Sequence, residues 1–353
     1  MKMLDAILGV SFAALIAWPC AGPMASPLPN SQESAAPAPL KLLQSIPLPG
    51  LKDGDFDHFA VDLAGHRLFL TAEKNTAVEV FDLNTNKLIH TITGLDEPHS
   101  MLYRADLKKL FVIDGGAAEV RMYDATSYKY LGGIKLKDDC DSMAYDPATK
   151  YLYVVNGGRG AKEAYSLISI IDTTAAKKVA DIRVETDSVE ALALEKSGPR
   201  LFVNMTGLNA VGVFDREKHT QLATWSIAEA AQHNVPLMFD EANHRLFLAA
   251  SGKPEKFVVL DSDSGKVVAS LPVASMVDDM AFDSASKRIY TPGTEFVDVF
   301  QQKDADHYEQ IGHIPGSFRA KTAILVPQLK RYFLAVPAHA GNQAEVRVFE
   351  VVQ

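Results

Sequence analysis

The sequence predicts an all-β protein, a seven-bladed β-propeller with four antiparallel strands in each blade. Three observations support this prediction: a repeat of about 43 residues, strand-like sequence throughout each repeat, and a chain start that supplies the strand missing from the last repeat. The chain has 353 residues, of which 47% are hydrophobic and 22% charged, so it can bury a core of this size.

The repeat is marked by a pair of apolar residues, the second of them aromatic. Successive pairs are 42, 42, 49, 45, 43 and 43 residues apart. The pairs are Leu68-Phe69, Leu110-Phe111, Leu152-Tyr153, Leu201-Phe202, Leu246-Phe247, Ile289-Tyr290 and Tyr332-Phe333. They lie in short apolar runs such as RLFLTA and YLYVVN, which predict buried strands.

Three further strands complete each unit. About a dozen residues after the pair comes a run that ends in an acidic residue, such as VEVFD, and then a fourth strand, such as KLIHTI. An inner strand, such as FAVD, precedes the pair. A polar residue seven positions before the aromatic opens the turn after this strand, and six repeats have it: Asp62, Arg104, Asp146, Glu195, Asp240 and Asp283.

The two ends of the repeat array complement each other. The last repeat stops at VRVFEVVQ, after its third strand, whereas residues 40–50, LKLLQSIPLPG, resemble the fourth strand of the other repeats. Pairing them would close the ring and remove two open sheet edges. The sequence therefore predicts one propeller domain over residues 40–353, with its last blade closed by the N-terminal strand.

The residues before this domain predict export. Lys2 followed by the apolar run AILGVSFAALIAW is typical of a signal peptide, assigned to residues 1–21, and the run is short for a membrane span. Residues 22–39 are rich in Pro, Ala and Ser and predict a linker. We expect a periplasmic or secreted protein without a transmembrane domain in the mature chain. Lipid attachment at Cys20 is the less favoured alternative, because Pro19 precedes the cysteine.

The net charge disfavours one class of partner. At -9, the average surface repels phosphate backbones, so nucleic acid is not expected as a partner. A small molecule or a protein remains, and we expect the chain to be a monomer.

The motif YLYVVN, residues 151–156, resembles the Tyr-Val-Thr-Asn signature of YVTN-type propellers, and the chain resembles their extracytoplasmic YncE-like members over all seven repeats. This resemblance implies a binding or interaction module. Related seven-bladed propellers include lactonases and a metal-dependent lyase, which leaves an enzyme as the alternative.

Polar residues precede most of the inner strands and predict a ligand site at the mouth of the central channel. Side chains from the rim, some of them on a long Gly-rich insertion at residues 156–166, complete the expected top-face site. The site comprises Asp57, His58, His99, Asp141, Glu190, Asn156, Arg159, Asp278, Asp279, Arg319 and Lys321. An equally weighted interpretation is a channel entrance that is polar only because it faces water.

Three histidines predict a more specific chemistry. Ring closure would bring His339 of the last blade near His58 and His99 of the first two, beside acidic residues. Imidazoles in such a setting bind a divalent metal or transfer protons, although loop histidines are more often simply solvated. GxSxG and HExxH patterns do not occur. The sequence thus predicts a binding module that takes a small molecule or protein at its top face. A metal-assisted lactonase or lyase at the channel mouth is the alternative, with no cofactor fixed by a motif.

Overall fold

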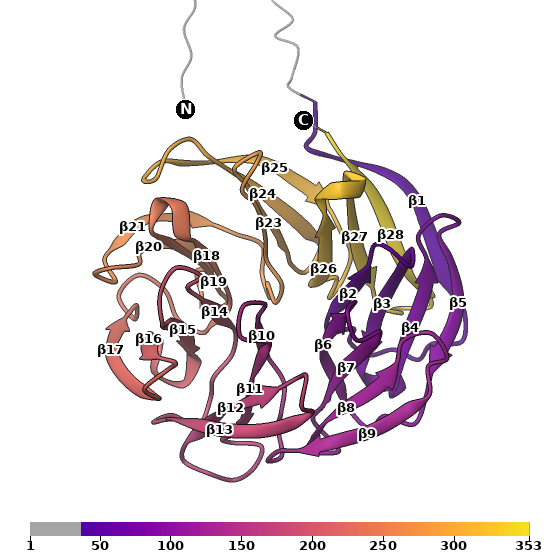
Figure 1. Cartoon of the computed structure of the whole chain (residues 1–353). Helices are drawn as coiled ribbons and strands as arrows, with labels where there is room; N and C mark the ends of the chain where they lie inside the picture. Colours follow the sequence, from indigo (N-terminus) through magenta and orange to yellow (C-terminus); the bar gives the residue numbers. More distant parts are fainter. Residues whose placement is uncertain (1–36, 353) are drawn as a thin grey trace, which may run out of the picture. The chain divides into compact units, whose positions relative to one another are not determined.

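The computed structural model describes residues 37–352, which form a ring of seven four-stranded antiparallel sheets (Figure 1). This arrangement confirms the predicted seven-bladed propeller. The predicted signal peptide, Cys20 and most of the linker lie outside the described residues. Within 37–352, none of the helical segments has the length and apolar character needed to cross a bilayer.

The two inner strands of each blade follow the predicted units. The innermost strands are β2 (Phe59–Asp62), β6 (Pro98–Arg104), β10 (Met143–Asp146), β14 (Leu192–Leu194), β18 (Asn234–Asp240), β22 (Ala281–Asp283) and β26 (Thr322–Val326). The second strands, which carry the anchor pairs, are β3 (Arg67–Ala72), β7 (Lys109–Asp114), β11 (Tyr151–Gly157), β15 (Arg200–Met205), β19 (Arg245–Ala250), β23 (Arg288–Pro292) and β27 (Arg331–Val336).

The two outer strands complete the sheets. The third strands are β4 (Ala77–Asp82), β8 (Glu119–Asp124), β12 (Ser166–Asp172), β16 (Ala210–Asp215), β20 (Lys256–Asp261), β24 (Phe296–Gln302) and β28 (Ala344–Val351). The outermost strands are β5 (Lys87–Ile92), β9 (Tyr130–Lys135), β13 (Lys177–Val184), β17 (Thr220–Ser226), β21 (Val267–Pro272), β25 (Tyr308–Pro315) and β1 (Leu40–Leu48). Within the described residues, four single-turn 3₁₀ helices lie in the connections: η1 (Glu73–Asn75), η2 (Thr206–Leu208), η3 (Glu241–Asn243) and η4 (Pro327–Leu329).

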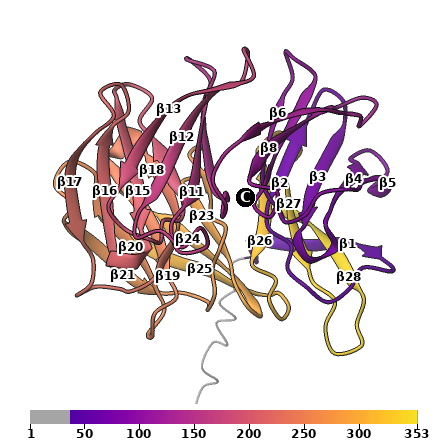
Figure 2. The same cartoon turned by 90° about the horizontal axis from the view of Figure 1, so that it is seen from below.

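The last blade is closed by the first strand, as predicted. β1 pairs antiparallel with β28, from Leu40 opposite Val351 to Leu48 opposite Ala344, with an irregularity in register after Leu42. The side view in Figure 2 shows the two strands together at one side of the ring. Because β1 occupies the outer edge of blade seven, β28 has no open edge.

Acidic residues at the ends of third strands fix the following turns. Asp82 Oδ1 accepts a hydrogen bond from the Thr85 backbone N–H at 2.7 Å, and Asp172 Oδ1 accepts one from Ala175 at 2.9 Å. A carboxylate that bonds its own backbone three residues later stabilises a tight turn. This is why the predicted runs end in Asp.

The hydrophobic cores lie between neighbouring blades. Seven clusters fill the seven blade interfaces, and each anchor aromatic is at most 2% exposed. The cluster between blades seven and one contains Ile46 and Leu48 of β1 together with Leu68 and Phe333. A single blade therefore cannot bury its faces alone, and the ring folds as a unit.

Cys140 is a buried thiol between blades two and three. It is 0% exposed, and its Sγ donates to the Asp114 carbonyl oxygen at 3.3 Å. Burial raises the pKa of Cys140 to about 12, so little of the reactive thiolate is present at neutral pH.

We therefore expect Cys140 to resist an aromatic disulfide reagent at pH 8 in the folded protein and to react fully in urea. The measurement should use a Cys20→Ser variant so that a single thiol is counted. Equal labelling rates in buffer and in urea would contradict this prediction.

Candidate functional site

The candidate site is a cavity of about 240 Å³ at the face of the ring where the inner strands begin. We call it the axial cavity. Six blades line it, through residues 57–59, 100–101, 141–143, 190–192, 235–238 and 278–280. These segments converge because each leads into an inner strand beside the axis (Figure 1).

The lining of the axial cavity changes from acidic to apolar along four of its six segments. The carboxylates Asp57, Asp141, Glu190 and Asp278 come first, with Asp279 directly after the last of these. Two residues after these four carboxylates lie Phe59, Met143, Leu192 and Met280, and the two remaining segments add Met101 and Leu237. The acidic positions were predicted from the sequence, but this apolar floor was not. One sequence pattern could have indicated this floor: Ser100-Met101 recurs as Ser142-Met143 at the repeat interval.

His58 is held by a carboxylate from another blade. Its Nδ1 lies 2.8 Å from Asp279 Oδ1, and Asp279 Oδ2 accepts a hydrogen bond from the Ala323 backbone N–H at 2.9 Å. Its Nε2 lies 3.6 Å from Asp57 Oδ1. Burial alone would lower the pKa of His58, but Asp279 and Asp57 raise it well above its usual value.

Asp57 links the first two blades. Its Oδ2 lies 2.6 Å from His99 Nδ1, which is also 3.7 Å from Asp141 Oδ1. Burial would raise the pKa of Asp57, but His58 and His99 lower it to about 2. Burial would lower the pKa of His99, but Asp57 and Asp141 raise it to about 9. Asp57 is therefore an ionised carboxylate in a largely desolvated position.

The pKa values of Asp141 and Glu190 are shifted upward, in the opposite direction to that of Asp57. Burial and then repulsion from Asp57 raise the pKa of Asp141 to about 6. Burial and then repulsion from nearby carboxylates, Asp141 first, raise the pKa of Glu190 to about 8. Asp278 likewise has a raised pKa through burial, opposed by Lys321. The axial cavity thus contains more carboxylate groups than its basic side chains can neutralise.

The basic residues predicted for the rim are engaged in ion pairs. Lys321 Nζ lies 2.9 Å from Asp278 Oδ2, and an Arg319 nitrogen lies 2.5 Å from Asp55 Oδ1. Lys321 thus compensates one carboxylate of the axial cavity, whereas Arg319 pairs with an aspartate that is not part of its lining.

The long insertion lines a second cavity of about 330 Å³ between blades three and four. Arg159 lies there, 73% exposed and 3.3 Å from Asp187, and the second cavity shares Asp141 and Glu190 with the axial cavity. Asn156 is different from the other predicted rim residues. It is 0% exposed and bonds Ser169 Oγ and the Lys137 backbone N–H, so it supports the sheet and presents no surface to a ligand.

The three predicted metal-binding histidines do not come together. His58 and His99 both contact Asp57. His339 stacks on Phe318, with ring centroids 4.0 Å apart, and lines a separate cavity whose other residues come from blade seven and the loop before it. Closure of the ring brings blades seven and one together, but His339 is not among the residues that line the axial cavity.

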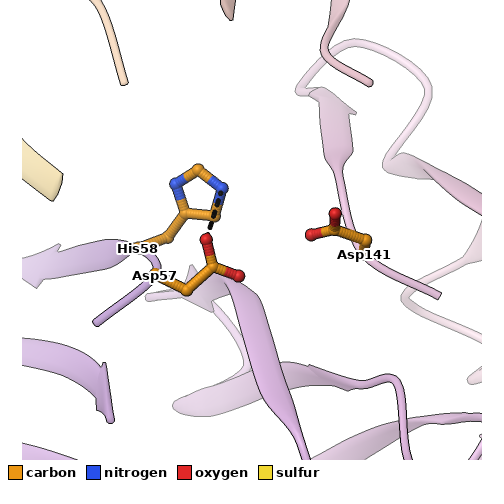
Figure 3. A group of neighbouring side chains, drawn as sticks. All are labelled: Asp57, His58 and Asp141. Atoms are coloured by element: carbon orange, nitrogen blue, oxygen red, sulfur yellow. Dashed lines mark ion pairs between the residues drawn. The ribbon is translucent and has the colours of Figure 1, made fainter. Parts of the chain in front are cut away.

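Another set of metal-binding side chains does come together. One donor atom each of Asp57, His58 and Asp141 lies within 4.8 Å of the others. Figure 3 shows Asp57 and His58 side by side, with the Asp141 carboxylate facing them from the segment that leads into blade three. Imidazole nitrogen and carboxylate oxygen are suitable ligands for a divalent metal and are also proton-transfer groups.

Comparisons with known proteins show the fold of the chain. No protein-family model and no curated protein matches its sequence. A chain of hydrazine synthase from Kuenenia stuttgartiensis is similar, with a TM-score of 0.70, 16% identity and coverage of 85% of this chain and 98% of that one. A chain in a mitotic checkpoint complex is similar with a TM-score of 0.72, 14% identity and coverage of 97% and 99%. U3-55K is similar with a TM-score of 0.69, 12% identity and coverage of 88% and 98%. At these identities the chain shares a propeller fold with all three, and no activity follows.

Proposed function

We propose that this chain is an exported, YncE-like binding module that takes a small, positively charged ligand in its axial cavity. The family resemblance of the YLYVVN repeat and the leader-like residues 1–21 support the YncE-like and periplasmic or secreted parts of this proposal. The fold is consistent with a binding module.

The observation that carries the ligand class is the charge of the axial cavity. Five carboxylates line it, whereas the basic groups in contact with them are His58, His99 and Lys321. A cation would offset the remaining repulsion in a partly desolvated site. The recessed shape favours a small ligand over a protein surface, since pockets of a few hundred Å³ enclose small molecules.

This proposal predicts that cations stabilise the protein selectively. Melting temperatures should be measured at constant ionic strength with putrescine, choline, Mg²⁺ and Zn²⁺, and with citrate and gluconate as anionic controls. At least one cation should raise the melting temperature by several degrees, because a ligand at 100 times its Kd contributes about 2.7 kcal/mol. The double variant Asp141→Asn with Glu190→Gln should lose this response.

The matched control is Asp187→Asn, which removes a carboxylate from the second cavity but not from the axial one. It should keep the response. Stabilisation by the anions alone, or an equal response in the double variant, would contradict the proposal.

A metal-assisted lactonase or lyase is the second candidate, and the approach of Asp57, His58 and Asp141 favours it. A bound metal would supply Lewis-acid polarisation of a carbonyl oxygen. Glu190 lines the same cavity and would serve there as a general acid or base. Hydrolysis of γ-butyrolactone that is lost in His58→Ala would favour this candidate over a pure binding module.

A further inference from the structure

We infer that the cation of the axial cavity is a divalent transition-metal ion ligated by Asp57, His58 and Asp141. This inference rests on the proposed function, because it names the chemical class of the ligand for the same cavity. The ligand set differs from the histidine trio that the sequence indicated, since His99 and His339 are not part of it.

The first support is the position of Asp57. The residue is only 8% exposed, and its Oδ2 is engaged by His99 at 2.6 Å. Within the described part of the chain, its Oδ1 accepts no hydrogen bond and faces His58 across 3.6 Å. A desolvated carboxylate oxygen without a hydrogen bond, directed at a cavity, is the state expected of a ligand atom.

The second support is the distance between the donor atoms. Two ligands at about 2.1 Å from one tetrahedral ion lie about 3.4 Å apart. His58 Nε2 and Asp57 Oδ1 are separated by 3.6 Å, which is too long for a hydrogen bond but matches this spacing. The Asp141 donor is within 4.8 Å of both, and its side chain is 36% exposed, so a rotation can bring it closer.

The third support is the set of groups behind the ligands. Asp279 fixes the Nδ1 side of His58 and is itself fixed by the Ala323 backbone N–H, which leaves Nε2 directed into the cavity. A carboxylate behind the imidazole is the usual arrangement at metal-binding histidines. His99 holds Asp57 in the same way from the other side. Both ligands are thus oriented by residues of other blades.

The mixture of donors selects the kind of metal. One imidazole nitrogen with two carboxylate oxygens suits zinc, manganese, cobalt or ferrous iron, whereas calcium and magnesium prefer oxygen alone. Three protein ligands also leave a coordination position for water or a bound molecule, as catalytic zinc sites do. Phe59, Met101 and Met143 line the same cavity and would give a molecule bound at this position apolar contacts.

The test is calorimetric titration of the chelator-treated full chain with Zn²⁺. The titration is repeated with Co²⁺, whose binding is monitored by its visible absorption. We expect one ion per chain. His58→Ala should weaken Zn²⁺ binding more than 100-fold, and Asp279→Asn, which leaves all three ligands in place, should weaken it 10- to 100-fold. Circular dichroism and the melting temperature would show that each variant is folded.

The matched control is His313→Ala. His313 Nδ1 also lies against an aspartate, Asp298, at 2.5 Å, but on an outer strand away from the axial cavity. The His313→Ala variant should bind Zn²⁺ as tightly as the wild type does. Stoichiometric binding that survives in His58→Ala would overturn the ligand assignment, and so would a wild type that binds none of the divalent transition metals. If putrescine or choline binds while no metal does, the inference fails and the proposed function stands; if no cation binds, both fail.

Discussion

A chain that lacks residues 1–50 should fail to form the closed ring, whereas a chain that lacks only residues 1–36 should be as stable as the full protein. The shorter chain loses β1, which carries Leu40, Ile46 and Leu48 at 3%, 4% and 1% exposure. Burial of a Leu or Ile side chain contributes about 1.5–3 kcal/mol. Three such side chains are comparable to the whole stability of a typical domain, about 5–15 kcal/mol. Urea unfolding of both truncations measures the difference.

Two further measurements separate loss of β1 from a general effect of shortening. A synthetic peptide of residues 39–50 should restore the truncated chain in a concentration-dependent way, because it binds only the folded edge of β28. In the full chain, Ile46→Ala should cost about 2–5 kcal/mol, while Leu42→Ala on the same strand, 51% exposed, should change stability by about 0.5 kcal/mol or less. Equal stability of the two truncations would refute the role of β1.

Glu190→Gln should stabilise the metal-free protein at alkaline pH and have little effect at pH 5. The pKa of Glu190 rises from 4.5 to about 8 on folding, first through burial and then through repulsion from other carboxylates such as Asp141. Between pH 4.5 and about 8, Glu190 holds a proton in the folded protein that it has released in the unfolded chain. Stability therefore falls as pH rises from 4.5 toward about 8, and the amide variant does not suffer this loss.

The expected gain at pH 8.5 is about 2 kcal/mol, which is less than the full pKa difference implies because several carboxylates share the repulsion. Urea unfolding in the presence of a chelator, at pH 5 and pH 8.5, measures it. Glu229→Gln is the control, since Glu229 is exposed on the connection after β17 and its loss should matter little at either pH. A gain of the same size at both pH values would show that ionisation of Glu190 is not its cause.

The fold followed from the sequence because propeller blades repeat their local rules. The anchor pairs, the terminal aspartates of the third strands and the fit of residues 40–50 to the open blade are all local patterns, and local patterns can be read along a chain. The acidic positions of the axial cavity followed for the same reason. Each sits at a fixed offset from an inner strand.

The contacts inside the site could not be predicted in this way. His58 pairs with Asp279, and His99 with Asp57, across blade boundaries, and these pairs depend on how the blades are arranged around the axis. Asn156 illustrates the same limit, because the motif that contains it does not show that its side chain turns into the sheet toward Ser169. His339 lies on a loop whose path the repeat does not fix.

The pairing of β1 with β28 also sets a condition on the order of folding. Leu40 is opposite Val351, so one blade joins the two ends of the described chain. Contacts between such distant residues form slowly, because the intervening chain must first be brought together. A ribosome releases β28, the partner of β1, only after the other strands of the ring have been made. The nascent protein therefore stays open along one interface until β28 has emerged, and the native ring forms only after that.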